Sequence, residues 1–379
     1  MAELVTLEDI HAARERIVGV AVRTGLYEVD AARLKAAGAG ELPFRLWIKA
    51  ESEQPIGSFK LRGAYNCIAQ LSQEELRRGV ITYSSGNHAQ GVAYAARALG
   101  AKAVIVMPEA APMIKREATL AMGAEVVLVG PASSERLAKA QELSSQHGYR
   151  IIPPYDHPAI IAGQGTCGLE IVEQMGLVEE SPQGLKPPSL SGDVYGTHST
   201  ALRAGSEAVP LSKTKDKVVV LSPVSGGGLL SGIATAAKLA APGRTQVWAA
   251  EPELAADATE SFRTRKLVEW PAEKTARTIC DGLRTQSMGV LNFAHVMRYV
   301  DGMVNVSEDE ILRAMRIMLT ATDLVPEPSG AVTFAAALFH HGELPPCERM
   351  VAVLSGGNID PALKAKLEAD ASARAVAGV

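Results

Sequence analysis

The strongest constraint on the fold is a series of short apolar runs, several of which are followed by a helical pattern. Each run is rich in β-branched or other apolar residues without polar alternation, as in strands that are buried on both faces of a parallel sheet. We therefore predict an α/β fold built on open, parallel-type sheets with flanking helices. The runs cover residues 80–83, 103–107, 126–129, 218–221, 247–250 and 350–354.

Composition excludes several classes of protein. The 379 residues suffice for one large or two closely associated domains, and 47% are hydrophobic against 21% charged, unlike a disordered chain. Lys and Arg number 38 and Asp and Glu 42, so no overall positive charge would attract nucleic acid or an anionic membrane. No run approaches the roughly 18 apolar residues of a membrane span. We expect a small-molecule partner, and neither a nucleic-acid nor a membrane partner.

The four cysteines indicate the compartment. Cys67, Cys167, Cys280 and Cys347 are far apart and form no CxxC pair. This spacing is unlike a disulfide framework or a zinc motif. We therefore expect reduced thiols and a cytoplasmic location.

Two helix starts and one irregular segment also stand out. Thr6 with Asp9, and Ser307 with Glu310, have the spacing of a capping box, in which each side chain bonds the other residue's backbone N–H. Residues 179–217 are rich in Pro, Ser, Gly and Lys and have little periodicity. We predict an exposed insertion there.

Three segments rich in Ser, Gly and Asn follow predicted strands. Open α/β sheets bind ligands beyond the carboxyl ends of their strands, so these segments are candidate binding loops. Residues 225–228 precede a helical pattern and could cradle a phosphate with successive backbone N–H groups. Residues 84–88 and 355–358 are the other two segments. The alternatives are ligand-free turns at 225–228 and 355–358, and an ordinary helix N-cap at 84–88.

Together with residues 57–64 (GSFKLRGA), these segments resemble the fold-type II pyridoxal phosphate enzymes, and most closely the family of serine racemases and serine/threonine dehydratases, which includes threo-3-hydroxyaspartate dehydratases. The resemblance runs from Ile56 to Asp360 and includes residues 157–168 (HPAIIAGQGTCG) and 327–330 (EPSG). It implies a fold like the tryptophan synthase β chain, with the active site between two domains. The large domain would comprise residues 1–81 and 156–379, with the insertion at about 179–217, and the small domain residues 82–155.

The resemblance also assigns residues to pyridoxal 5'-phosphate. Lys60, next to Phe59, matches the Schiff-base lysine, whose amine can lose its proton in an apolar pocket and act as a base. Asn87 matches the partner of the cofactor ring hydroxyl, and Ser355 the neutral partner of the pyridine nitrogen, which favours elimination over transamination. The residues that match the phosphate loop are Ser225, Gly226, Gly227, Gly228 and Leu229, with Ser225 where the family usually has glycine.

On the substrate side, Ser84, Asn87 and His88 match residues around the substrate carboxylate. Ser85 matches a hydroxyl on the ring face opposite the lysine, where proton return would invert Cα, so racemisation stays open.

Arg136 and Arg284 could each bind a second substrate carboxylate bidentately, which would suit threo-3-hydroxyaspartate. The alternative is that both arginines face solvent or form ordinary ion pairs.

A cation site is also implied. Glu251, Ala255 and Asp257 have the spacing of the family's divalent cation site, with two carboxylates and one carbonyl as ligands for Mg²⁺, Ca²⁺ or Mn²⁺. Without the resemblance, they would be taken for surface carboxylates.

The implied enzyme is a lyase that dehydrates a β-hydroxy α-amino acid of the L-serine or L-threonine type to a 2-oxo acid and ammonia. The alternatives are a threo-3-hydroxyaspartate dehydratase, a serine or aspartate racemase and, least favoured, a non-catalytic pyridoxal-phosphate-binding protein. The resemblance implies a homodimer. Residues 361–379 are too few for a regulatory domain.

Overall fold

The computed structural model describes residues 3–84, 86–109, 111, 113–130, 133–178 and 217–377. Apart from Lys217, the predicted insertion at 179–217 lies outside the described residues. The strands are β1 Leu26–Glu28, β2 Arg45–Ala50, β3 Val80–Tyr83, β4 Ala103–Pro108, β5 Glu125–Val129, β6 Arg150–Ile151, β7 Val218–Pro223, β8 Thr245–Pro252, β9 Gly302–Val306 and β10 Arg349–Leu354.

The helices alternate with the strands over most of the chain, as expected for an α/β fold. The α-helices are α1 Leu7–Ile17, α2 Ala31–Ala36, α3 Lys60–Ile68, α4 Gln73–Arg78, α5 Asn87–Ala98, α6 Met113–Ala121, α7 Ser133–His147, α8 Pro158–Gln174, α9 Gly228–Ala240, α10 Asp257–Thr264, α11 Ala272–Thr275, α12 Val290–Tyr299, α13 Glu308–Ala321, α14 Pro328–Phe339 and α15 Pro361–Ala377. Three short 3-10 helices are η1 Glu51–Glu53, η2 Glu253–Ala255 and η3 Asp281–Leu283.

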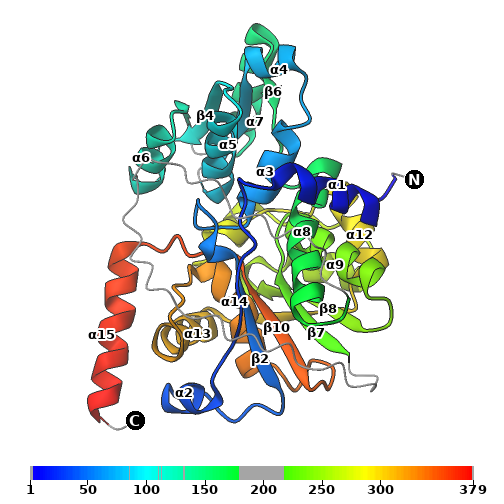
Figure 1. Ribbon diagram of the computed structural model, residues 1–379. Helices are drawn as coiled ribbons and strands as arrows, with labels where there is room; N and C mark the ends of the chain where they lie inside the picture. Colours follow the sequence, from blue (N-terminus) through cyan, green and yellow to red (C-terminus); the bar gives the residue numbers. More distant parts are fainter. Residues whose placement is uncertain are drawn as a thin grey trace.

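Two sheets form two lobes, with the smaller above the larger in Figure 1. The large sheet has the order β1-β2-β10-β7-β8-β9, and its neighbours are parallel except for β1, which is antiparallel to β2. The small sheet has the order β5-β4-β3-β6 and is parallel throughout. All six predicted strands are present, and the predicted α/β fold class is confirmed.

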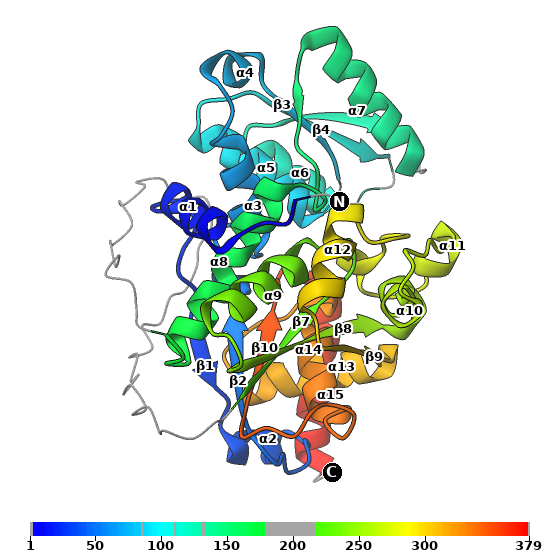
Figure 2. The ribbon, with the colours of Figure 1, turned by 90° about the vertical axis from the view of Figure 1, so that its right-hand side faces the viewer.

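Successive residues of the same strand pack into different cores. Val219 and Leu221 of β7 lie in a core with α13 and α14, whereas Val218 and Val220 face α8 and α9. Figure 2 shows these helix pairs on opposite sides of the large sheet. The large sheet is thus buried on both faces, which explains its uninterrupted apolar strands.

Helix α8 joins the parts of the molecule that surround the site. A Cβ on Gly163 of α8 would lie 2.6 Å from Cα of Gly63 in α3, and a Cβ on Gly232 of α9 would lie 2.5 Å from the backbone nitrogen of Gly165 in α8. Helices α3 and α9 therefore pack against α8 at backbone contact. Since α3 begins at Lys60 and α9 at Gly228, these contacts fix the positions of two predicted site segments.

A buried group of charges lies beside the same helices. Four side chains form this Arg62 cluster: Lys49, Glu51, Arg62 and Glu170. Arg62 contacts Glu51 at 2.7 Å and Glu170 at 2.6 Å, and Lys49 contacts Glu170 at 2.6 Å. Burial by itself would raise the pKa of Glu51, but the charge of Arg62 prevails and lowers it to about 2. The cluster ties β2, η1, α3 and α8 together.

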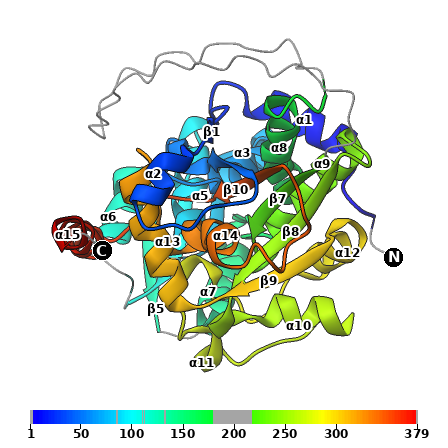
Figure 3. The same ribbon diagram turned by 90° about the horizontal axis from the view of Figure 1, so that it is seen from below.

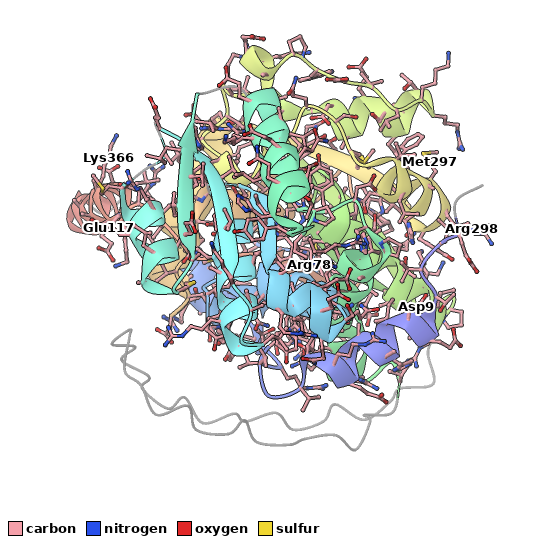
Figure 4. All side chains as sticks on the ribbon, turned by 90° about the horizontal axis from the view of Figure 1, so that it is seen from above. Asp9, Arg78, Glu117, Met297, Arg298 and Lys366 are labelled. Carbon is pink, nitrogen blue, oxygen red and sulfur yellow. The ribbon has the colours of Figure 1, made fainter. Side chains whose placement is uncertain are left out.

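Both predicted capping boxes are present, at the starts of α1 and α13. The four cysteines carry free thiols, as predicted. Helix α15 lies at the edge of the molecule in Figure 3. Charged residues of both signs, such as Glu117, Arg298 and Lys366, lie near the outline of the molecule in Figure 4. Each described helix is too short or too polar to cross a membrane.

Candidate active site

Lys60 is the first residue of α3, and its amine contacts the segment that connects β6 of the small sheet to α8. Nζ donates a hydrogen bond to the carbonyl oxygen of Pro154, just after β6, at 2.9 Å. The backbone N–H of Phe59 donates to the carbonyl oxygen of Ser355, just after β10, at 3.1 Å. Burial lowers the pKa of Lys60 to about 8, and no described carboxylate forms an ion pair with it. The amine can therefore be neutral at a moderately alkaline pH.

Residues 225–229 form the buried start of α9. Gly227 is the N-cap residue with φ 94°, a left-handed conformation that favours glycine, and no side chain caps the helix. A Cβ on Gly226 would lie 2.4 Å from the ring of Tyr155. Among the described residues, none accepts a hydrogen bond from the N–H of Gly226 or Gly227. A buried helix start with free N–H groups fits a phosphate.

Ser225 departs from the family's usual glycine, and its side chain turns toward a neighbouring loop. Its Oγ lies 2.7 Å from Oγ1 of Thr285 and accepts a hydrogen bond from the Thr285 N–H at 3.2 Å. The hydroxyl therefore links residues 225–229, which we call the phosphate cradle, to the segment that follows η3.

Ser355 is buried directly after β10. Its hydroxyl makes one long contact, 3.5 Å to the carbonyl oxygen of Ser329. The hydroxyl is thus weakly engaged and able to bond a further group.

Asn87 opens α5 and is held by two side chains. Its Nδ2 donates to Glu327 at 2.8 Å, and its Oδ1 accepts from Nδ2 of Asn358 at 2.8 Å. Burial, followed by repulsion from Asp281, raises the pKa of Glu327 to about 7. The carboxyl group of Glu327 is therefore partly protonated near neutral pH.

The start of α5 lacks a described side-chain cap. Gly86 is its N-cap residue, and Ser84 Oγ accepts a hydrogen bond from the Gly86 N–H at 3.3 Å. His88 is buried with Nε2 at 3.1 Å from the carbonyl oxygen of Ile152. Burial, and then the nearby charge of Lys60, lowers the pKa of His88 to about 3, so the ring is neutral. The predicted position Ser85 lies outside the described residues.

The two predicted arginines lie in different lobes. Arg284 follows η3 in the large lobe, and its Nε and one Nη donate to the carbonyl oxygen of Thr278 at 2.9 and 2.6 Å. A substrate contact by Arg284 would have to replace these bonds. Arg136 lies on α7 of the small lobe, where burial lowers its pKa.

One ion pair connects the lobes near the site. Lys115 of α6 pairs with Asp281 of η3. The pair joins a helix that follows a strand of the small sheet to the loop that precedes Arg284 in the large lobe.

The three residues of the predicted cation site lie together around the start of α10. Glu251 is buried and accepts hydrogen bonds from the N–H of Ala258 and from the N–H and hydroxyl of Thr259 at 2.7–3.1 Å. Asp257 is also buried, and neither of its carboxylate oxygens has a hydrogen-bond partner among the described residues. In the part of the chain that the structure describes, no group of three or more His, Cys, Asp or Glu side chains is arranged to hold a metal ion; the predicted set has two carboxylates and a carbonyl.

Several residues that touch the predicted site, or support residues that do, belong to none of the predicted motifs. Their only sequence signal is position, since three of them directly precede the 157–168 motif. They are Pro154, Tyr155, Asp156, Thr285 and Asn292.

Comparisons with known proteins agree with this geometry. A family model described as pyridoxal-phosphate dependent enzyme matches residues 28–356. The chain belongs to this family. Lys60, the 225–229 cradle and Ser355 all fall within the matched region, and the free N–H groups and the weakly basic amine fit a phosphate-bearing cofactor with an aldehyde.

Relatives in this pyridoxal-phosphate family carry related activities. The chain is 35% identical over 316 residues to the L-threo-3-hydroxyaspartate ammonia-lyase of Saccharomyces cerevisiae, covering 83% of each chain. It is 37% identical over 358 residues to the L-threonine ammonia-lyase of Thermotoga maritima, covering 94% of this chain and 76% of that protein. The crystal structure of serine racemase from Dictyostelium discoideum has a TM-score of 0.75 and 33% identity, covering 94% of this chain and 99% of that one.

These findings confirm the predicted family, the fold-type II architecture, the pyridoxal phosphate cofactor and a lyase of the dehydratase family. The relatives are enzymes named for small amino acids. The individual roles of the site residues, the domain boundaries and the cation stay predictions.

Proposed function

We propose that this enzyme removes water from a β-hydroxy α-amino acid of the L-serine or L-threonine type and releases a 2-oxo acid and ammonia. The observation that carries the proposal is the weakly basic Lys60 amine near two helix starts that no described side chain caps. The start of α9 suits the cofactor phosphate, and the start of α5 suits the substrate carboxylate, because free N–H groups and the helix dipole stabilise anions.

Lys60 and the residues around it would bind the cofactor and take up the substrate proton. Pyridoxal phosphate, when bound, supplies an electron-withdrawing ring that acidifies the Cα proton of the amino acid. Lys60 would hold the cofactor through its aldehyde and take up the Cα proton, which its lowered pKa allows. Ser355 would place a neutral hydroxyl beside the ring nitrogen, and Asn87 would hold the ring hydroxyl.

Release of 2-oxo acid tests this function. Purified enzyme supplied with pyridoxal phosphate is assayed on L-serine, L-threonine and the isomers of 3-hydroxyaspartate. We expect turnover of L-serine or L-threonine, and its loss in Lys60→Ala. Cofactor binding without turnover of any of these amino acids would contradict the proposal and favour a non-catalytic binding protein.

Dehydration of threo-3-hydroxyaspartate is the second candidate. It is favoured by the name of the Saccharomyces cerevisiae relative. It would need a positively charged side chain to bind the second carboxylate of the substrate. Arg136→Ala and Arg284→Ala assign that role: a preference for hydroxyaspartate that falls in one variant identifies the arginine. Indifference to both substitutions would leave L-serine or L-threonine as the substrate.

Racemisation depends on Ser85 in the proposed scheme. Replacing Ser85 by Ala should abolish any racemisation of L-serine or L-aspartate and leave elimination largely unchanged. Chiral chromatography of the products checks this. Unchanged racemisation would contradict the assignment of Ser85.

A divalent cation is proposed at Glu251, Ala255 and Asp257. The support is the burial of two neighbouring carboxylates without a positive partner among the described residues. Such charges are stabilised by pairing or by metal coordination, and oxygen ligands suit Mg²⁺, Ca²⁺ or Mn²⁺. The site would stabilise α10 and take no part in the chemistry.

The remaining proposals rest on the family resemblance. They are a large domain of residues 1–81 and 156–379, a small domain of residues 82–155 and a homodimer. A cytoplasmic location is proposed on a different ground, the four widely spaced free cysteines. Gel filtration with light scattering tests the dimer, which should have twice the mass of one chain.

A further inference from the structure

We infer that Asp156 is a positioning residue that orients the phosphate cradle through the start of α12. The inference rests on the proposed function, because it concerns the loop proposed to hold the cofactor phosphate. It assigns a role to a residue that neither touches the phosphate loop itself nor belongs to a predicted motif.

The carboxylate of Asp156 caps α12 from a distant part of the chain. It accepts hydrogen bonds from the N–H groups of Val290 at 3.0 Å, Leu291 at 3.0 Å and Asn292 at 3.2 Å. The N-cap position of α12 is Gly289, which has no side chain to do this, and a Cβ there would lie 2.3 Å from the Asp156 carboxylate. One carboxylate thus holds three N–H groups at the positive end of the helix dipole.

The capped start of α12 holds the cradle in turn. The carbonyl oxygen of Gly226 accepts from Nδ2 of Asn292 at 2.8 Å and from the N–H of Gly289 at 3.0 Å. In a trans peptide the C=O and the next N–H point in opposite directions. Fixing the Gly226 carbonyl on α12 therefore directs the Gly227 N–H to the other side, where no described residue accepts it.

The segment around Asp156 also contacts the reactive amine. Pro154 accepts the hydrogen bond from Lys60 Nζ, and the ring of Tyr155 packs over Gly226. Three consecutive residues thus contact the amine, the cradle and the helix that supports the cradle. This arrangement sets the spacing between Lys60 and the phosphate loop.

Selectivity for the phosphate group tests the inference. Cofactor-free protein is titrated with pyridoxal phosphate and, separately, with pyridoxal, which lacks the phosphate, and binding is followed by fluorescence. We expect Asp156→Ala to weaken pyridoxal phosphate binding about tenfold, on the scale of one lost charge-assisted hydrogen bond, and pyridoxal binding by less than about twofold. A merely structural role would not separate the two ligands.

Two further variants keep the test decisive. Asp30→Ala removes a carboxylate that caps α2, which is remote from the cradle, and should change neither affinity. Asn292→Ala removes one donor to Gly226 while Asp156 stays in place, and should reproduce the selective loss even if Asp156→Ala does not fold.

Equal weakening of both ligands in Asp156→Ala and Asn292→Ala, or no weakening in either, would overturn the positioning role. Wild-type protein that binds pyridoxal phosphate no more tightly than pyridoxal would overturn the assignment of the cradle. Wild-type protein that binds neither ligand would overturn the proposed function itself.

Discussion

Two of the groups of charged side chains that are buried in the described part of this chain differ in how their charges are balanced. In the Arg62 cluster, two cations and two carboxylates alternate at 2.6–2.7 Å. At the start of α10, Glu251 and Asp257 are both carboxylates, and Asp257 lacks a described partner. Burial, followed by repulsion from Asp257, raises the pKa of Glu251 well above its usual range.

The contrast between the two groups shows which buried charges indicate a ligand. A balanced cluster holds structural elements together and needs nothing from outside, whereas two buried like charges are costly unless a cation joins them. Lys60 belongs with the second group, since its buried amine donates to the Pro154 carbonyl and forms no ion pair with a described carboxylate. The proposed binding positions are those where a charged group is buried without an opposite charge among the described residues.

Breaking the balanced cluster should have the largest effect. Arg62→Ala leaves Glu51 and Glu170 buried without their main counter-charge, and we expect the free energy of unfolding to fall by about 3–5 kcal/mol. Urea denaturation of the cofactor-free protein measures this. The matched control is Arg45→Ala, which removes an exposed pair with Glu28 and should cost less than about 1 kcal/mol. Similar losses in the two variants would contradict the comparison.

Supplying the missing charge should have the next largest effect. We expect Mg²⁺ or Ca²⁺ to raise the free energy of unfolding of the wild type by about 2.7 kcal/mol at a hundred times its Kd. Glu251→Gln should abolish this increase, whereas Glu253→Gln, an exposed neighbour, should retain it. Thermal unfolding with and without the cation measures the difference. An increase that persists in Glu251→Gln would place the cation elsewhere.

Glu327 is a further buried carboxyl that forms no ion pair with a described cation, and pH tests its effect on stability. Its folded-state pKa of about 7 lies above the ordinary value of 4.5, so the folded state holds this proton more tightly. The resulting stabilisation is complete below pH 4.5 and is lost as the pH rises through about 7. Glu327→Gln should remove this decline, whose slope is at most about 1.4 kcal/mol per pH unit.

Urea denaturation of the cofactor-free protein between pH 4.5 and 7.5 provides the measurement for Glu327. Glu41→Gln, at an exposed carboxylate paired with Lys35, serves as the control and should leave the slope unchanged. Parallel pH profiles for the wild type and Glu327→Gln would show that Glu327 is already ionised at low pH.

The smallest effect is expected at the pair between the lobes. Lys115 is 17% and Asp281 41% exposed, so water screens their interaction. We expect Lys115→Met to lower the free energy of unfolding by less than about 1 kcal/mol and the difference to shrink with added salt. Denaturation at two salt concentrations measures this. A loss as large as that of Arg62→Ala would mean that partial exposure does not separate the two kinds of ion pair.

The sequence predicted those strands whose side chains are apolar on both faces. It did not predict β2, where Arg45 and Lys49 interrupt the apolar pattern. Lys49 is nevertheless fully buried, because its charge is met by Glu170 from α8, 121 residues away. A charge that is balanced by a distant residue gives no local signal. The two-residue strand β6 is too short to give one either.

In the candidate site, too, some residues could be predicted from the sequence and others could not. Lys60, Ser355 and the 225–229 segment could be predicted, because they follow strands and match family motifs. Asp156 and Asn292 could not. The hydrogen bonds of Asp156 join segments 134–136 residues apart, and the side chain of Asn292 bonds Gly226, 66 residues away, so both depend on the folded arrangement of α12. The orientation of the Ser225 hydroxyl toward Thr285 is likewise set by tertiary contact.

The glycine contacts of α8 have a consequence for protein engineering. Because Gly163 meets Gly63 of α3, and Gly165 meets Gly232 of α9, with no room for side chains between them, the three helices cannot be exchanged one at a time. A chimera that takes α8 from a relative needs glycine at the positions of Gly163 and Gly165, or has to take α3 and α9 from the same parent. Recombination boundaries placed outside these three helices, in the loops between them and the sheets, would keep this unit intact.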